Sequence, residues 1–217
     1  MKLQTSVVLM GLALAGANTA YAVDVTSYDV AHAQASGYGG WSHTYTGSIA
    51  SDGLGTQNYT GGGGTLNDGL YSTDHTNNQL FTIPSNTSIT LYLSSTSNVS
   101  GISIFGGDYP ANAIPGMLTG WSVTIGGVTT ALASTAFGPN CSGALCNDSV
   151  SLLGTGLESI ATNTVVLSNF QGGWADYYNA TEITVSAIAV PEPESYAMLL
   201  AGLLLVGTVV RRRQAKG

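Results

Sequence analysis

All fixed positive charge in this chain lies at its two ends. Five of the 217 residues are Lys or Arg, and they are Lys2, the triplet Arg211 to Arg213, and Lys216. The stretch from Val23 to Ala189 holds ten of the 12 acidic residues and no Lys or Arg. A domain built from this stretch must fold without lysine or arginine salt bridges. Its surface has nothing to attract phosphate, which excludes nucleic acid and anionic lipid as partners.

The N-terminus has the pattern of a secretory signal peptide. Lys2 is followed by an apolar stretch over residues 7–17 and then by the small residues Ala20 and Ala22. This order predicts removal of residues 1–22, with cleavage after Ala22. The mature chain then starts at Val23, outside the cytoplasm. A buried N-terminal helix is the alternative.

The C-terminus predicts a membrane segment. A Pro-Glu-Pro triplet precedes an uninterrupted apolar run from Ala197 to Val210, and three arginines follow the run directly. As a helix, the run would be about 21 Å long, against about 30 Å of membrane hydrocarbon. The long arginine side chains can reach the headgroups, and clustered arginines stay on the cytoplasmic side. We therefore expect a transmembrane helix over residues 197–210, with the domain outside and the tail inside.

This tripartite tail resembles the PEP-CTERM sorting signal of Gram-negative bacteria. The resemblance covers residues 190–217, and its motif residues are Pro191, Glu192, Pro193, Arg211, Arg212 and Arg213. It implies a membrane-embedded exosortase as partner, which cuts near the Pro-Glu-Pro triplet. The inner membrane would then be a sorting intermediate, and the domain would pass to the cell envelope or extracellular matrix. A C-terminal anchor that is never cut is the alternative.

Several short runs between the two ends alternate apolar and polar residues. The apolar positions are Ile89, Leu91 and Leu93; Ile102 and Ile104; Trp121, Val123 and Ile125; and Ile183, Val185 and Ala187. A period of two indicates half-buried antiparallel strands. Further strands are expected over residues 23–31, 44–50, 150–153 and 164–167, with the glycine run 61–64 as a flexible loop. With no convincing amphipathic helix, the sequence predicts an all-β antiparallel β-sandwich over residues 23–189.

A finer resemblance rests on four segments of this domain. They are Leu66-Asn67-Asp68-Gly69, Ser88 to Leu93, Val99 to Ile104, and Thr181-Glu182-Ile183-Thr184-Val185. Together they resemble the discoidin-type, galactose-binding-like jelly roll, and a generic sandwich is the alternative. The resemblance implies a structural calcium at Asp68, because calcium takes carboxylate and carbonyl oxygens. An Asp-Gly turn without an ion is the alternative.

Aromatic residues supply a candidate glycan-binding site. Trp41 lies in a Gly-rich stretch with Tyr38 and Tyr45, and Trp174 lies between Gly173 and the last strand. Flat aromatic rings in loops can stack on sugar rings of an exopolysaccharide. Packing of the same side chains in the sandwich core is the alternative.

The two cysteines predict a local disulfide. Cys141 and Cys146 enclose four residues, and a compartment outside the cytoplasm is oxidising. Because the closed loop is short, we expect a stabilisation at or below about 2–4 kcal/mol. Two thiols without further ligands do not indicate zinc.

Catalytic patterns are weak in this chain. His32, His43 and His75 have no metal-binding spacing, and no Gly-x-Ser-x-Gly sequence is present. Glu158 and Glu182 are the only glutamates of the domain, and each is expected at an outward strand position. The sequence thus favours a non-enzymatic surface or matrix protein with a structural or weak glycan-binding role, without a catalytic residue or a cofactor other than calcium. A secreted polysaccharide hydrolase is the alternative.

The two end segments predict a processed product. In a host with the sorting protease, the surface-released protein should begin at Val23 and lack the apolar segment from Ala197 onward. Intact-mass spectrometry of the released form measures both ends at once. Recovery of residues 197–217 on the released protein would contradict the prediction.

Overall fold

The structure is a computed structural model. It describes residues 20–33, 42–71, 80–82, 86–107, 118–133, 145–172, 178–188, 200–204 and 206. The domain is built from strands, which are β1 (Ala20–Val23), β2 (Val25–Ala33), β3 (Ser48–Ser51), β4 (Gln57–Gly62), β5 (Leu80–Thr82), β6 (Ser88–Gly107), β7 (Leu118–Ile125), β8 (Val128–Ala133), β9 (Leu145–Ser151), β10 (Ala161–Gly172), β11 (Tyr178–Ala180) and β12 (Glu182–Ile188). Every pairing between them in the described residues is antiparallel. The prediction of an all-β antiparallel domain is confirmed.

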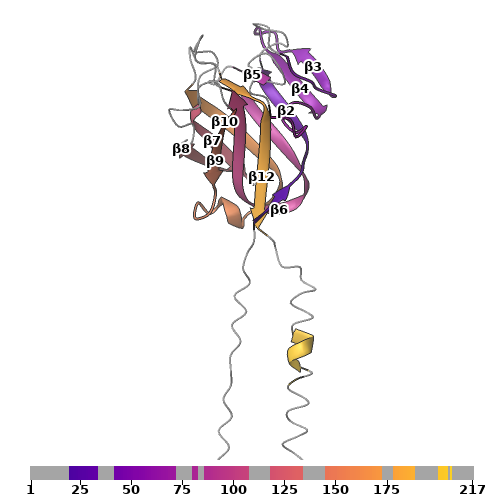
Figure 1. Ribbon diagram of the computed structural model, residues 1–217, viewed down its shortest axis with the longest axis vertical. Helices are drawn as coiled ribbons and strands as arrows, with labels where there is room; N and C mark the ends of the chain where they lie inside the picture. Colours follow the sequence, from indigo (N-terminus) through magenta and orange to yellow (C-terminus); the bar gives the residue numbers. More distant parts are fainter. Residues whose placement is uncertain are drawn as a thin grey trace, which may run out of the picture.

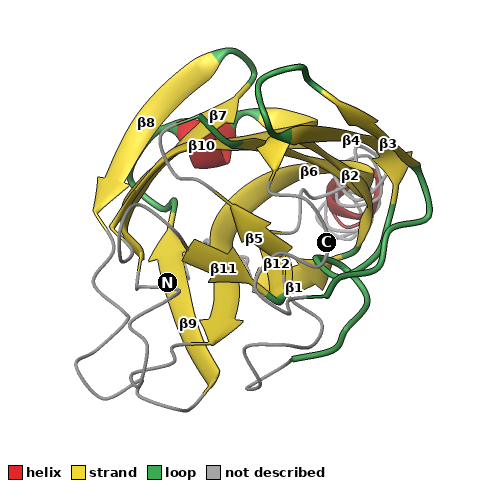
Figure 2. Ribbon diagram, turned by 90° about the horizontal axis from the view of Figure 1, so that it is seen from above, coloured by secondary structure: helices red, strands yellow, loops and turns green. Residues whose placement is uncertain are grey.

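The 20-residue strand β6 takes part in both layers of the fold (Figure 1). From Ser88 to Asn98 it pairs with β2 on one side and with β10 on the other. From Asn98 to Gly107 it pairs with β12 and β9. The first layer continues through β10 to β7 and β8, and through β2 to β4 and β3. Figure 2 shows the two groups of strands facing each other, with β6 curving from one group to the other.

The interior is filled by the alternating apolar residues. All members of the four runs are buried, and none is more than 6 % exposed. The predicted core positions on β6, β7 and β12 are therefore confirmed. Burying one such Val, Leu or Ile side chain stabilises a fold by about 1.5–3 kcal/mol, so these positions contribute strongly to closing the layers.

The glycine run is the main error of the sequence-based prediction. Residues 61–64 do not form a loop of their own, because Gly62 ends β4 and Gly64 forms a bridge with Tyr45. A Cβ atom on Gly62 would clash with the main chain of Gly47 and with the ring of Tyr45. The missing side chain is what lets two backbone segments approach this closely.

Three smaller expectations also need correction. The strand expected over residues 44–50 is displaced to β3, and the first expected strand divides into β1 and β2. Glu158 lies in a 3-10 turn, η2 (Leu157–Ser159), and not on a strand. There its carboxylate accepts hydrogen bonds within the turn, including one from the main-chain N–H of Gly154 at 2.9 Å.

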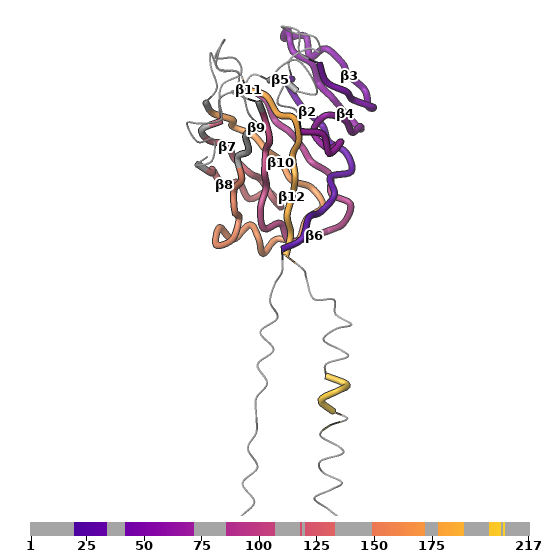
Figure 3. The backbone as a smooth tube through the Cα atoms, viewed as in Figure 1, coloured from indigo at the N-terminus to yellow at the C-terminus, as the bar shows by residue number. Residues whose placement is uncertain are grey.

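The first and last strands of the domain lie side by side. β1 pairs with β12 so that Ala20 faces Ile188 and Val23 faces Val185. Figure 3 shows the start of β1 and the end of β12 meeting at one end of the domain. The two residues predicted to mark signal cleavage, Ala20 and Ala22, are thus extended and lie in a strand. The N-terminal and C-terminal segments both leave the domain from this end.

The tail is described only in part. Residues 200–204 are helical, while the motif residues 191–193 and 211–213 lie outside the described residues. Within the described portion, no helix has the length and apolar character needed to cross a membrane.

The close approach at Gly62 predicts a strong effect of one methyl group. Gly62→Ala should destabilise the domain by about 1–3 kcal/mol, because neither the Gly47 backbone nor the Tyr45 ring can move away freely. Gly120→Ala is the matched control in β7, since its nearest neighbours would lie at 3.4 Å, an ordinary contact. Urea unfolding followed by circular dichroism gives both values. Equal stability of the two variants would contradict this explanation of the glycine run.

Candidate functional site

The loop between β4 and β5 is fixed against β2 and β12 by main-chain and amide contacts. The N–H of Ile183 donates to the carbonyl of Leu66 at 2.9 Å. The Asn67 side chain donates to the carbonyl of Val25 at 2.8 Å and accepts from the N–H of Gly64 at 2.8 Å. These bonds place the Asp-Gly turn that follows, at residues 68 and 69, directly over the start of β12.

The carboxylate of Glu182 binds the main chain of this turn. Its Oε2 accepts the main-chain N–H of Gly69 at 2.9 Å, and its side chain is almost fully buried, with the residue only 5 % exposed. The Asp68 carboxylate accepts the N–H of Leu70 at 2.9 Å and so closes the turn. The expectation that Glu182 points outward is wrong. The loop from β4 folds over the first residue of β12 and covers it.

Two carboxyl groups are therefore close together with no basic side chain to offset them. Burial, together with the nearby Asp68 carboxylate, raises the pKa of Glu182 to about 7, although the hydrogen bonds from the turn work in the opposite direction. The sequence has no Lys or Arg between Lys2 and Arg211, so the domain has no such residue to place here. A divalent cation is the group that would stabilise both carboxylates at once. Calcium suits these oxygen ligands and the main-chain carbonyls of such a loop.

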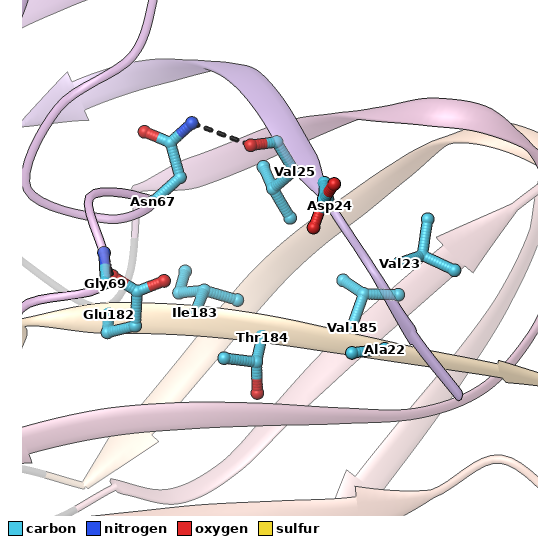
Figure 4. Close-up of a pocket in the computed structure, with 10 residues that line it drawn as sticks. All are labelled: Ala22, Val23, Asp24, Val25, Asn67, Gly69, Glu182, Ile183, Thr184 and Val185. Atoms are coloured by element: carbon cyan, nitrogen blue, oxygen red, sulfur yellow. Dashed lines mark hydrogen bonds between the residues drawn. The ribbon is translucent and has the colours of Figure 1, made fainter. Parts of the chain in front are cut away.

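A hollow of about 300 Å³ lies beside this turn (Figure 4). It is lined by Ala22, Val23, Asp24, Val25, Asn67, Gly69, Glu182, Ile183, Thr184 and Val185. Asp24 and Glu182 are both on its wall, but Glu182 is already engaged by the turn, and none of the lining residues is aromatic. The hollow therefore offers carboxylate and amide groups and no platform for a sugar ring.

The predicted glycan-binding residues, Trp41 and Trp174, lie outside the described residues. The strand ends that flank their segments are described, however, and both pair with the same residue of β5. Ala33, the last residue of β2, pairs with Thr82 in β5, and Thr82 pairs with Tyr178, the first residue of β11. The segment with Trp41 follows Ala33, and the segment with Trp174 precedes Tyr178. We call the row Ala33, Thr82 and Tyr178 the β5 edge.

Two tyrosines beside these segments pack in the core or against it. Tyr178 is 1 % exposed and its ring lies 4.8 Å from that of Phe170. Tyr45 packs between Tyr28 and Tyr59, with ring centroids 5.2 Å from each. For these two side chains the packing alternative holds. The predicted disulfide is not described, because Cys141 lies outside the described residues.

The histidines differ in their surroundings. His43 packs against Tyr59 at 5.2 Å, and burial lowers its pKa. His75 lies outside the described residues. His32 pairs with Asp52, with Nδ1 2.8 Å from Oδ2. Sequence reasoning missed this pair, since the two residues are 20 positions apart and no local motif marks them.

Comparison with known proteins identifies the tail. Residues 189–214 match the PEP-CTERM protein-sorting motif, and the match begins directly after β12 ends at Ile188. No curated protein matches the chain. The resemblance of the tail to this sorting signal is thereby confirmed.

Solved structures that resemble the chain are distant. One is a truncated AlyQ with CBM32 and alginate lyase domains, at 15 % identity and a TM-score of 0.42, over 80 % of this chain and 34 % of that one. A second is a histidine mutant of the lectin binding domain of Lectinolysin complexed with Lewis b, at 15 % identity and a TM-score of 0.40, over 58 % and 82 %. A third is the CBM32 of AlyQ in complex with 4,5-unsaturated mannuronic acid, at 18 % identity and a TM-score of 0.35, over 56 % and 81 %. The chain spans about a third of the first of these structures. What the comparisons establish is the tail, a PEP-CTERM sorting motif that marks an exported protein.

Proposed function

We propose that this chain is a non-enzymatic protein of the cell surface or extracellular matrix that binds neutral glycans at the β5 edge. The observation that carries the proposal is the strand register, which sets the flanking residues of the Trp41 and Trp174 segments side by side through Thr82. The segments that contain the two tryptophans thus adjoin the two strands that flank β5, and indole rings can stack on a sugar chain.

The sorting route follows from the tail. A signal peptide over residues 1–22 starts export, and a membrane helix over residues 197–210 with its arginines in the cytoplasm holds the chain in the inner membrane. An exosortase then cuts near Pro191 to Pro193 and releases the domain. The site of release lies just beyond Ile188, at the end of the domain where β1 begins. β5 lies at the opposite end of the domain from the release site (Figure 1).

The charge of the domain selects the type of glycan. With ten carboxylates and no Lys or Arg between residues 23 and 189, the surface repels acidic polymers. A bound polysaccharide is therefore neutral, or acidic only where calcium bridges the carboxylates. Nucleic acid is excluded for the same reason.

The Asp-Gly turn has a structural part in this function. We assign Asp68 and Glu182 as ligands of a calcium ion that braces the loop between β4 and β5 against β12. The contact between the turn and the last strand also supports the galactose-binding-like type of sandwich. The ion supplies positive charge where the chain has none, and it takes no part in bond breaking.

A secreted polysaccharide hydrolase is the less favoured alternative. Glu182 faces Phe105 at the start of β12, whereas Glu158 lies near Asn98, which faces Ile188 at the other end of that strand. The two glutamates are thus at opposite ends of the domain. A glycosidase needs its two carboxyl groups within about 10 Å of each other. Asp68 and Glu182 do lie close together, but each already accepts a main-chain N–H of the turn.

The proposed stacking predicts which side chains carry affinity. Trp41→Ala and Trp174→Ala should each weaken binding to neutral exopolysaccharide by about 1–3 kcal/mol, whereas salt should change affinity little because no counterions are released. Leu153→Ala is the matched control, since Leu153 is 59 % exposed and lies at the tail end of the domain. Calorimetry at low and high ionic strength measures the affinities. Tight, salt-sensitive and calcium-independent binding to an acidic polymer would contradict the proposal, and binding to no glycan would indicate a purely structural role.

The assignment of Glu182 predicts a pH-dependent response to calcium. In EDTA the raised pKa of Glu182 favours its protonated form, so the contribution of this group to stability is complete below about pH 4.5 and is lost as the pH rises through about 7. Calcium should therefore raise the unfolding midpoint much more at pH 7.5 than at pH 5. Glu182→Gln should abolish both the pH slope in this range and the calcium response. Glu158→Gln, at the other end of the domain, should keep both, and a calcium response retained in Glu182→Gln would refute the assignment.

A further inference from the structure

The end of β2 contains a histidine with a backbone conformation that is rare for residues other than glycine. His32 has a φ of 59°, in the left-handed region. It lies in an irregularity of the β2–β4 pairing, since Val30 faces Tyr59 and Ala33 faces Gln57, which leaves one extra residue on β2. Bulges of this kind redirect a side chain away from its regular alternation. Here the redirected side chain is the imidazole of His32, one residue before the β5 edge.

Three hydrogen bonds from separate segments hold this residue in place. The main-chain N–H of His32 donates to Oδ1 of Asn58 at 3.2 Å, and the hydroxyl of Thr87 donates to its carbonyl at 3.2 Å. The ring itself is fixed by Asp52, whose Oδ2 lies 2.8 Å from Nδ1. Backbone strain persists only where surrounding contacts determine the conformation in this way, and it is concentrated at functional sites.

The partner carboxylate is itself fixed and ionised. Asp52 accepts the hydroxyl of Thr56 and the main-chain N–H groups of Leu54 and Thr56, the latter two at 2.8 and 3.1 Å. These bonds, that of the Thr56 hydroxyl first, hold the pKa of Asp52 well below its usual range. An ionised carboxylate only accepts hydrogen bonds, so Nδ1 of His32 carries the proton. In the neutral ring Nε2 is then an acceptor.

Part of the imidazole is open to a ligand. The Asp52 side chain is 4 % exposed, whereas that of His32 is 36 % exposed. The ring can therefore be reached from solvent, while the carboxylate that orients it is covered. No group of three or more His, Cys, Asp or Glu residues suited to a metal occurs among the described residues. The ligand that fits a single fixed acceptor on an anionic surface is a neutral hydroxyl group.

We propose that His32 accepts a hydrogen bond from a sugar hydroxyl at the β5 edge through Nε2, with Asp52 as the positioning residue. The proposal rests on the proposed glycan binding and adds a specificity element to it. The tryptophans supply stacking that tolerates many sugars, whereas a fixed acceptor distinguishes one hydroxyl from its absence or from a different configuration. An analogue that lacks the hydroxyl loses this one hydrogen bond and binds less tightly for that reason.

The tautomer of His32 can be tested without any glycan. Long-range ¹H–¹⁵N spectra of the secreted protein at pH 8 should show His32 protonated at Nδ1 and unprotonated at Nε2. In Asp52→Asn the ring should populate both tautomers, because the acceptor that selects Nδ1–H has lost its charge. A wild-type ring protonated mainly at Nε2 would overturn the proposal.

The hydroxyl contact is tested with methyl glycosides of glucose, galactose, mannose and fucose and the deoxy analogues of the tightest binder. For the wild type, one deoxy analogue should bind roughly tenfold more weakly than its parent. In His32→Phe, which keeps a ring of similar size, the parent should bind as weakly as that analogue does to the wild type. Ser51→Ala on the neighbouring strand β3 is the control and should behave as wild type. Circular dichroism establishes that each variant is folded.

The outcomes distinguish a failure of the His32 proposal from a failure of the proposed glycan binding. Undiminished binding of the parent glycoside to folded His32→Phe overturns the role of His32 and leaves glycan binding standing. Binding of none of the four glycosides to the wild type overturns both. Loss of the same deoxy discrimination in His32→Phe and in Asp52→Asn supports the acceptor and its positioning residue together.

Discussion

The pairing of β6 with four other strands is the constraint on which the rest of the sandwich depends. Its first part lies between β2 and β10, and its second part lies between β12 and β9. Because one continuous strand supplies the centre of both layers, the register in one layer fixes the position of the other. The start of β12 is thereby brought under the Asp-Gly turn, and the end of β2 is brought to β5. Both candidate sites are consequences of the path of this strand.

The absence of lysine and arginine from the domain decides how its acidic groups are stabilised. In the described residues, carboxylates are held by N–H and hydroxyl donors. Asp29, for example, accepts the hydroxyl of Tyr92 at 2.8 Å and the main-chain N–H of Gly61 at 2.7 Å. Asp52 is likewise held by N–H and hydroxyl donors, and it also contacts the ring of His32. Glu182 departs from this pattern, since burial outweighs its hydrogen bonds and raises its pKa.

What could be predicted from the sequence is what depends on neighbours along the chain. Alternation at Ile89, Leu91 and Leu93 reports a strand and its buried face directly, and the order of proline, apolar and arginine segments reports the sorting signal. Burial of Glu182 depends on Gly69, 113 residues away, and the orientation of His32 depends on a bulge and on Asp52. Neither leaves a local pattern. The glycine run was misread for the same reason, because the partner that makes Gly62 necessary, Gly47, lies in another segment.

The side-by-side exit of the two termini has a mechanical consequence. In the proposed anchored state, a pull on a glycan bound near β5 would be transmitted to Ile188 along the length of β12. That strand is joined to β6 over seven register pairs, from Glu182 facing Phe105 to Ile188 facing Asn98. Force parallel to the strands loads these hydrogen bonds in shear, all together, whereas force across them would break the bonds one after another. An anchor at this end would therefore load the domain in the direction in which an antiparallel sheet resists tension best.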